Sequence, residues 1–202
     1  NDENDIFFTV ADCTGHGVPG AFMSMIGTSL LNEIIIEKKI TNTDEVLNQL
    51  RTQIIKSLNQ SDAESQKDGM DISLCKLNVK KRELQFSGAL NSLIHISVDQ
   101  LAIYKGDPQP IGFTGGKNKS FTSNQIKLKK DDMVYIFSDG FQDQFGGTKG
   151  KKYRSNRFRD FLNKISLEHV DQQKKLLKKE FNDWKFNEEQ IDDVCVMGVR
   201  IT

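Results

Sequence analysis

Three acidic positions in this sequence stand at the ends of apolar runs. Asp12 and Asp139 each follow such a run, and the adjacent Asp192 and Asp193 precede one. Runs of this kind predict strands, and a rigid sheet holds a carboxylate at its end while the oxygens reach open space. If the three strands are neighbours, the carboxylates converge and repel one another unless a cation neutralises them. Oxygen-only ligands suit hard cations such as Mg²⁺ or Mn²⁺ rather than Zn²⁺.

Each acidic position taken alone also has a purely structural interpretation. An Asp-Gly pair after a strand, as at Asp139, is most often a turn. The adjacent Asp192 and Asp193 would suit the solvated start of a strand. The prediction of a cation site therefore depends on all three positions together.

The elements that must position these aspartates follow from hydrophobic periodicity. Short β-branched and aromatic runs predict strands at Ile6–Val10, Met70–Leu77, Leu84–Ser87, Leu93–Val98, Leu101–Tyr104, Met133–Ser138 and Val194–Ile201. A helical period predicts helices over Pro19–Lys38, from Thr43 to about Leu58, around Phe158–Ile165 and around Leu176–Trp184. The first helix has a broad apolar stripe, which predicts that it belongs mostly to the core. Strands in succession with helices before and after them indicate α+β layers rather than a parallel βαβ fold.

Composition excludes several classes of protein. The chain has 202 residues, which suits one domain, with 28 Lys and Arg against 28 Asp and Glu. The zero net charge argues against binding to duplex nucleic acid and against a disordered chain. The three cysteines form no CxxC pair, which fits a reducing, cytoplasmic compartment. The sequence contains no run of 18 apolar residues and no signal peptide at its start.

The region that begins at Asp12 resembles a known family. Asp12–Ala21 reads Asp-Cys-Thr-Gly-His-Gly-Val-Pro-Gly-Ala, which is similar to the Asp-x-x-Gly-His-Gly element of the SpoIIE-type (stage II sporulation protein E) phosphatases. These belong to the metal-dependent protein phosphatases related to protein phosphatase 2C. Further similar segments follow in family order at Lys67–Ile72, Phe86–Asn91, Lys105–Gly112, Ser138–Gly140 and Asp192–Val194. The resemblance covers about 190 residues.

This resemblance implies an α-β-β-α sandwich of two mainly antiparallel sheets flanked by helices. It implies hydrolysis of phosphoserine or phosphothreonine in a protein, with two Mn²⁺ or Mg²⁺ ions. Carried over by position, Asp12 bridges both metals with help from the Cys13 carbonyl, Asp139 binds one metal, and Asp192 or Asp193 completes the set. No protein nucleophile is required.

Two further features each have both a functional and a structural interpretation. His16, between Gly15 and Gly17, could protonate the leaving oxygen or could only shape the turn at a helix start. Lys149, Lys151 and Lys152 open a basic stretch, which is either a solvated loop or a loop that docks the phosphoprotein substrate beside the active site. Nucleic-acid binding by this stretch would need a strong salt dependence.

The resemblance also implies partners and a difference from the family. The substrate would be a phosphorylated regulator, such as an anti-sigma-factor antagonist, and an upstream sensor domain would precede this domain. Family members usually carry an earlier Gly-Asp-Phe-Tyr-Asp-like strand, whereas this sequence begins eleven residues before Asp12. The aspartate of that strand helps to hold the second metal, so we expect a SpoIIE-like domain that lacks its first strand or strands, with a damaged second metal site and weak or no activity. We also expect an open sheet edge that invites self-association. A catalytically impaired binding or regulatory module is the alternative.

Overall fold

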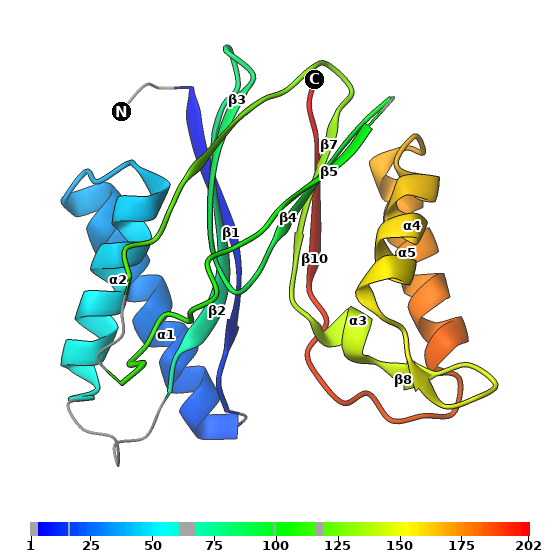
Figure 1. Cartoon of the computed structure of the whole chain (residues 1–202), viewed down its shortest axis with the longest axis horizontal. Helices are drawn as coiled ribbons and strands as arrows, with labels where there is room; N and C mark the ends of the chain where they lie inside the picture. Colours follow the sequence, from blue (N-terminus) through cyan, green and yellow to red (C-terminus); the bar gives the residue numbers. More distant parts are fainter. Residues whose placement is uncertain (1–3, 16, 61–67, 99, 116–118) are drawn as a thin grey trace. The chain divides into compact units, whose positions relative to one another are not determined.

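The computed structural model describes residues 4–15, 17–60, 68–98, 100–115 and 119–202. The chain forms two compact units, residues 1–93 with 104–128 and residues 94–103 with 129–202. Each unit has helices against one antiparallel sheet (Figure 1). The predicted α+β class is confirmed, with two antiparallel sheets that each carry their own helices.

The sheet of the first unit places Asp12 at a strand end. Its strands are β1 (Asp5–Cys13), β2 (Met70–Asn78), β3 (Glu83–Ala89) and β6 (Asn124–Lys127), in the order β1-β2-β3-β6. All neighbouring pairs are antiparallel, and the register sets Asp12 opposite Asp71. Strand β1 is longer than predicted because pairing with β2 continues from Asp5 to Cys13.

The helices of the first unit are α1 (Gly17–Asn32), the π-helical segment η1 (Glu33–Glu37) and α2 (Thr43–Ser57). Helix α2 matches its prediction, because its apolar stripe is fully buried against the sheet: Val46, Leu47, Leu50 and Ile54. Its first residue is tied to β3, since the Thr43 hydroxyl lies 2.8 Å from the Ser87 hydroxyl. Helix α2 therefore fixes the middle of the sheet.

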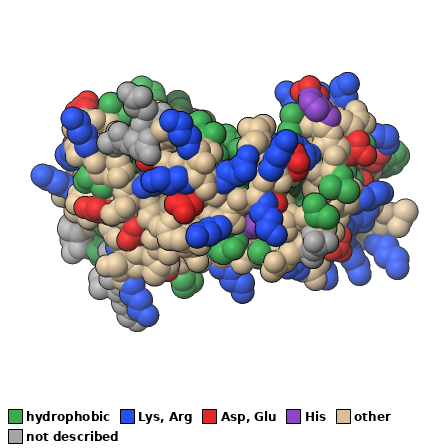
Figure 2. Space-filling view, turned by 90° about the horizontal axis from the view of Figure 1, so that it is seen from above, with side chains coloured by type: hydrophobic (Ala, Val, Ile, Leu, Met, Phe, Trp, Pro, Cys, Tyr) green, Lys and Arg blue, Asp and Glu red, His purple; other side chains and the backbone are tan. Residues whose placement is uncertain are grey.

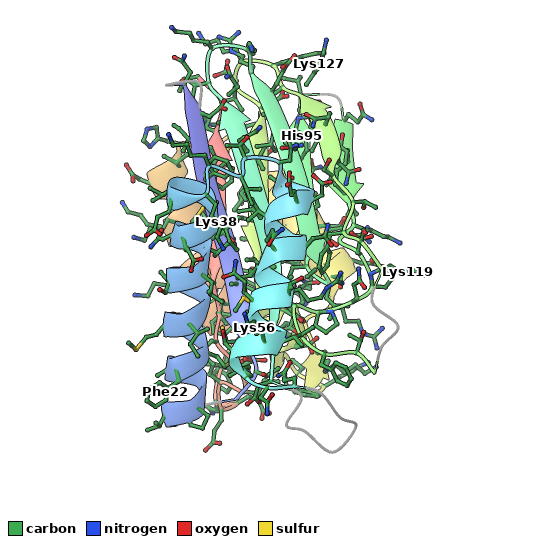
Figure 3. All side chains as sticks on the ribbon, turned by 90° about the vertical axis from the view of Figure 1, so that its left-hand side faces the viewer. Phe22, Lys38, Lys56, His95, Lys119 and Lys127 are labelled. Atoms are coloured by element: carbon green, nitrogen blue, oxygen red, sulfur yellow. The ribbon has the colours of Figure 1, made fainter. Side chains whose placement is uncertain are left out.

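The prediction that the first helix belongs mostly to the core is wrong. In α1 only Met23 and Gly27 are buried, whereas Phe22 is 59% and Met25 is 68% exposed (Figure 3 views this helical layer from outside). The apolar stripe is too broad for all of it to face the sheet, so one side of it packs and the side with Phe22 and Met25 does not.

This exposed helix also meets a composition test for membrane spans. The segment Gly17–Glu37 has a mean hydropathy of 1.2 in its 18-residue window, of which 17% is buried. Length and composition alone are weak evidence, because helices of globular cores pass the same test. Here Met23 and Ile34 pack into the core of the first unit, and this assigns the segment to the globular unit.

The second unit places Asp139 at the end of its central strand. Its sheet has the order β10-β7-β4-β5, formed by β10 (Val196–Arg200), β7 (Met133–Phe137), β4 (Leu93–Ser97) and β5 (Gln100–Tyr104). Helices α4 (Ser155–Ile165) and α5 (Val170–Lys185) cover it. Phe141 contacts the rings of Tyr153, Phe158 and Phe181 at centroid distances of 4.8–5.1 Å. This aromatic cluster anchors the segment after Asp139.

Four short elements were not predicted. Strand β6 forms because Leu84 and its neighbours in β3 offer an edge for pairing. Helix α3 (Gly140–Asp143) and the hairpin of β8 (Phe145–Gly146) and β9 (Lys151–Lys152) follow Asp139. Elements this short show no hydrophobic period in the sequence, so they can be recognised only from their contacts in the folded chain.

Candidate metal centre

Asp139 and Asp192 form a carboxylate pair in the second unit. Asp139 follows β7 directly and precedes α3, and its carbonyl accepts hydrogen bonds from the N–H groups of Gln142 (2.8 Å) and Asp143 (3.0 Å). Carboxylate oxygens of Asp139 and Asp192 lie within 4.8 Å of each other. Both side chains are exposed, so their oxygens are open to a ligand.

The hydroxyl of Ser138 fixes the backbone that carries Asp192. Ser138 is 3% exposed, and its Oγ donates to the Asp193 carbonyl (2.9 Å) and accepts from the Cys195 N–H (2.9 Å). Gly140 permits this approach, because a Cβ there would lie 2.4 Å from the Asp193 carbonyl oxygen. The end of β7 and the segment before β10 are thus held together at the carboxylate pair.

The carboxylate pair is electrostatically unfavourable without a cation. Burial raises the pKa of Asp139 above its ordinary value, and the negative charges of Asp192 and then Asp143 raise it further. The positive charge of Lys152 lowers the pKa of Asp139 only weakly, because the Lys152 Nζ is already paired with the Asp143 carboxylate at 2.7 Å. A bound cation would remove this repulsion.

The geometry distinguishes between the two adjacent aspartates of the C-terminal segment. The Asp192 carboxylate accepts a hydrogen bond from the Asp193 N–H at 2.7 Å. Asp193 contributes its backbone carbonyl to Ser138. In the described part of the second unit, the carboxylate that meets Asp139 is that of Asp192.

Asp12 lies in the first unit, half-buried, at the penultimate position of β1. The next residues turn sharply into α1. The Thr14 N–H donates to the Gly69 carbonyl (3.0 Å), and the Gly69 N–H donates to the Thr14 hydroxyl (2.8 Å). Gly15 has a φ of +90° and Gly17 a φ of +66°, which glycine adopts at little cost. This turn fixes where β1 ends and hence where Asp12 lies.

Two residues near Asp12, Cys13 and His16, were also candidate site residues. Burial raises the pKa of the Cys13 thiol, and the Asp12 carboxylate adds to that effect despite a hydrogen bond from Ser24. A thiol that stays protonated is a poor nucleophile. His16 lies outside the described residues.

The basic stretch contains one ordered hairpin beside the carboxylate pair. Lys151 and Lys152 form β9, and Lys149 lies in the exposed turn between β8 and β9. Lys152 is the member whose charge reaches Asp139, and it also lies over the Phe145 ring at 5.9 Å. The later residue Arg157 has a structural role, because it stacks on Trp184 at 4.3 Å.

Two contributors to this site were not singled out from the sequence. Ser138 precedes Asp139 in the Ser-Asp-Gly motif, but its function as a clamp depends on a segment 55 residues later. Asp143 acts through its ion pair with Lys152. Neither contact has a local sequence signal, since each depends on tertiary pairing.

Comparison with known proteins gives a family and a fold. The sequence profile of stage II sporulation protein E (SpoIIE) matches residues 2–202. The chain belongs to the SpoIIE family. This membership confirms the predicted class of enzyme, a phosphoprotein phosphatase of the protein phosphatase 2C type. A search of curated proteins gave no match.

Solved structures share the SpoIIE-family fold. The SiaA-PP2C domain of Pseudomonas aeruginosa has a TM-score of 0.85 at 24% identity, covering 100% of this chain and 77% of that one. The RsbU and RsbW domains of Rv1364c from Mycobacterium tuberculosis give 0.72 at 19% identity, covering 98% and 52%. RsbX in complex with magnesium gives 0.67 at 13% identity, covering 100% and 84%. At these identities the similarity shows the fold alone.

Proposed function

We propose that this SpoIIE-family domain hydrolyses phosphoserine or phosphothreonine in a regulatory protein, with Mn²⁺ or Mg²⁺ as its cofactor. The observation that carries the proposal is the Asp139–Asp192 carboxylate pair, whose backbone is held by Ser138 and whose negative charges raise the pKa of Asp139. In this proposal Asp12 and the Cys13 carbonyl complete the ligand set, and Asp192 rather than Asp193 is the ligand from the C-terminal segment.

The donor set fits the implied metals. Carboxylates and a backbone carbonyl are hard oxygen ligands, which Mg²⁺ and Mn²⁺ prefer. When bound, two such ions would lower the pKa of a water molecule, hold the phosphate and neutralise charge that develops during hydrolysis. The neighbour RsbX, described as a complex with magnesium, supports this choice.

The chain's own residues orient the ligands and the substrate. Ser138 holds the backbone of the Asp192–Cys195 segment, and Gly140 lets that segment approach. Lys152 is proposed to receive the phosphate, exchanging its partner Asp143 for the more highly charged group. Lys149 and Lys151 are proposed to contact acidic side chains of the substrate protein from the same hairpin.

The substrate is proposed to be a phosphorylated regulator of the anti-sigma-factor-antagonist type. The structure described as the RsbU and RsbW domains of Rv1364c supports a role in such signalling. An upstream sensor domain, cytoplasmic location and self-association remain predictions. Cationic and acidic side chains are interspersed on the face in Figure 2, which agrees with a protein substrate rather than nucleic acid.

The central experiment measures Mn²⁺ binding and hydrolysis of p-nitrophenyl phosphate by the 202-residue chain and by Asp139→Asn. We expect calorimetry to show Mn²⁺ binding by the parent and at least about tenfold weaker binding by the variant. Turnover should depend on Mn²⁺ and be lost in the variant. The exposed Asp160→Asn substitution is the matched control. Equal Mn²⁺ binding by parent and Asp139→Asn would refute the metal assignment, and binding without any turnover would favour a regulatory module.

Substrate docking is tested separately. Replacing Lys149, Lys151 and Lys152 by alanine should raise KM for a phosphoprotein by about tenfold or more. Lys152→Ala alone should also slow p-nitrophenyl phosphate hydrolysis, since that compound offers only the phosphate. A triple variant at the exposed residues Lys164, Lys174 and Lys175 controls for net charge. An unchanged KM for the phosphoprotein would argue against docking by this hairpin.

A further inference from the structure

A buried glutamine, Gln144, lies between two segments that the proposed function uses. It follows Asp143, the ion-pair partner of Lys152, and it precedes strand β8. Gln144 is 0% exposed, whereas Phe145 beside it is 40% exposed. Burial of a polar side chain is costly unless the side chain forms hydrogen bonds. The partners of Gln144 therefore indicate what this residue does.

The Gln144 carboxamide reaches the connection between α5 and β10, residues 186–195, which carries Asp192. Its Nε2 donates to the Glu189 carbonyl at 2.8 Å and to the Phe145 carbonyl at 3.0 Å. These two hydrogen bonds use both donors of the amide. One side chain therefore joins the start of the β8–β9 hairpin to the backbone three residues before Asp192.

The backbone of Gln144 is fixed from three sides. Its N–H donates to the Gly140 carbonyl (3.2 Å), and its carbonyl accepts from the Tyr153 N–H (3.0 Å) and from the Trp184 indole N–H (3.0 Å). These partners belong to α3, to the residue after β9 and to the last turn of α5. The carboxamide thus projects from a well-supported backbone, as a group that positions another residue requires.

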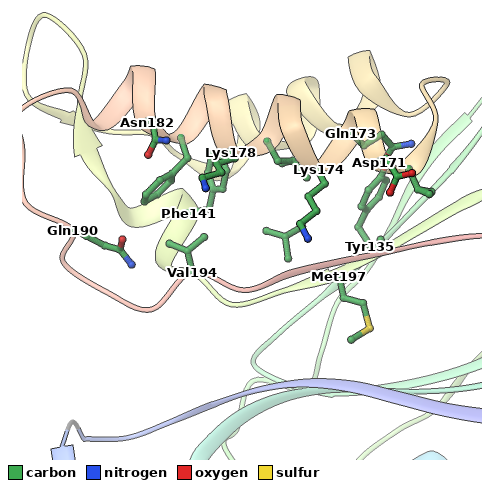
Figure 4. A pocket seen from close by; sticks show the side chains of 15 residues that line it. Tyr135, Phe141, Asp171, Gln173, Lys174, Lys178, Asn182, Gln190, Val194 and Met197 are labelled. Carbon is green, nitrogen blue, oxygen red and sulfur yellow. The ribbon is translucent and has the colours of Figure 1, made fainter.

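Side chains hold the irregular connection that carries Asp192. The Gln190 amide donates to the Asp192 carbonyl (2.8 Å), and the Ser138 hydroxyl donates to the Asp193 carbonyl (2.9 Å). Figure 4 shows Gln190 on this connection. Gln144 holds the connection before Asp192, and Ser138 holds it after Asp192. The candidate ligand therefore lies between two buried anchors.

The hydrogen bonds of Gln144 favour a positioning role over a stabilising one. Its Oε1 is buried and has no hydrogen-bond partner within the described ranges. An unpaired buried acceptor lowers the stability of the folded state, and an apolar side chain of similar length, such as methionine, would avoid this penalty. What glutamine supplies here, and methionine cannot, is the pair of Nε2 donors.

We propose that Gln144 is a positioning residue for the metal ligand Asp192, an inference that rests on the proposed phosphatase function. By fixing the connection at Glu189, it limits where the Asp192 carboxylate lies relative to Asp139. The same carboxamide is tied to the start of the hairpin that carries Lys152, so it also sets the ligand relative to the proposed phosphate contact. Ordering of the ligand before the cation arrives raises the affinity for the metal.

The test compares Gln144→Met with Gln173→Met, a matched substitution in the same unit. Gln173 is 3% exposed, its Oε1 accepts from the Tyr135 hydroxyl (2.6 Å), and its Nε2 donates to the Glu168 carbonyl (2.8 Å). It lies in the first turn of α5, at the opposite end of the helix from the connection (Figure 4). Both variants lose the donors of a buried glutamine, but only Gln144→Met loses those that hold the Asp192 segment.

Calorimetry should show Mn²⁺ binding weakened by about tenfold or more in Gln144→Met and unchanged in Gln173→Met. Urea unfolding should show the larger loss of stability for Gln173→Met, because both the donors and the acceptor of its amide are paired. Gln144→Glu, which keeps the shape of the side chain and loses the Nε2 donors, is a second variant and should also bind Mn²⁺ more weakly. Unchanged Mn²⁺ affinity in the Gln144 variants, or an equal loss in Gln173→Met, would overturn the proposal.

A metal-free measurement separates this inference from the proposed function. In EDTA, amide hydrogen exchange across residues 187–195 should be faster in Gln144→Met than in the parent or in Gln173→Met, since the connection has lost its tie. A parent that does not bind Mn²⁺ would refute the proposed function, and hydrogen exchange would still decide whether Gln144 holds the connection. Unchanged exchange across residues 187–195 would overturn the positioning role in either case.

Discussion

Ser138 is the residue that most directly fixes the backbone geometry of the candidate metal centre. It is buried, and it donates to one backbone group and accepts from another in the segment that carries Asp192. The carboxylates themselves are exposed and repel each other. The neutral, buried Ser138 hydroxyl therefore holds the ligand segment in position, while the charged carboxylates remain available to bind a cation.

Ser138→Ala should destabilise the protein and weaken Mn²⁺ binding together. The substitution removes both hydrogen bonds to the Cys195 N–H and the Asp193 carbonyl, which are part-buried, and this should cost about 1 kcal/mol. Urea unfolding measures the first effect and calorimetry the second. The exposed Ser29→Ala serves as control. An unchanged unfolding midpoint would show that the clamp contributes little.

Asp139→Asn should stabilise the metal-free protein. The raised pKa of Asp139 in the parent means that the folded state disfavours the ionised carboxylate. The contribution of the protonated carboxyl to stability is therefore present at low pH and is lost as pH rises through that pKa. In EDTA near pH 8 the variant should melt above the parent. This advantage should disappear in acid and reverse with Mn²⁺, as differential scanning fluorimetry can measure. A lower melting temperature in EDTA would contradict the repulsion argument.

At the scale of elements, Asp12 and Asp139 each lie where a strand meets a short, sharply turned connection. The turn from β1 to α1 is packed backbone against backbone, because a Cβ on Gly20 would lie 2.6 Å from the Gly15 carbonyl oxygen. The connection from β7 to α3 is equally tight at Gly140. Glycine is thus required by close approach at both turns.

Gly20→Ala should disturb this turn more than Gly27→Ala disturbs the same helix. At Gly27 the nearest atom to an added Cβ is the terminal methyl of Met70, which can move. At Gly20 it is backbone. We expect a loss of about 1–3 kcal/mol for Gly20→Ala and less for Gly27→Ala, measured by denaturant unfolding. Equal losses would show that the turn can relax.

At the scale of the whole molecule, the described chain has two hydrophobic cores, one for each compact unit. Leu50 belongs to the core of the first unit and Phe158 to that of the second, and both are 0% exposed. Each core is built by helices packed on one sheet. Local stability should therefore be distributed by unit rather than evenly along the sequence.

Leu50→Ala and Phe158→Ala should each cost about 2–5 kcal/mol. Hydrogen exchange should show the larger loss of amide protection in the unit that carries the substitution, β2 and β3 for the first and β7 for the second. Mass spectrometry of exchanged peptides resolves these segments. Uniform loss of protection across both units in both variants would instead indicate a single cooperative unit.

The sequence by itself determined much about this protein. Long elements with clear periodicity, such as α2 and β7, were predictable because burial imposes a repeating pattern. The acidic residues were predicted as ligands because strand ends, glycine turns and carboxylates coincide in the sequence. The family followed from the same motifs, in order along the chain.

Only the tertiary structure decided the remaining points. It showed that Phe22 and Met25 are exposed, because a broad apolar stripe does not indicate which part of it packs. It separated Asp192 from Asp193, since adjacent identical residues differ only in what surrounds them. It also revealed Ser138 as a clamp, because this contact joins segments distant in the sequence.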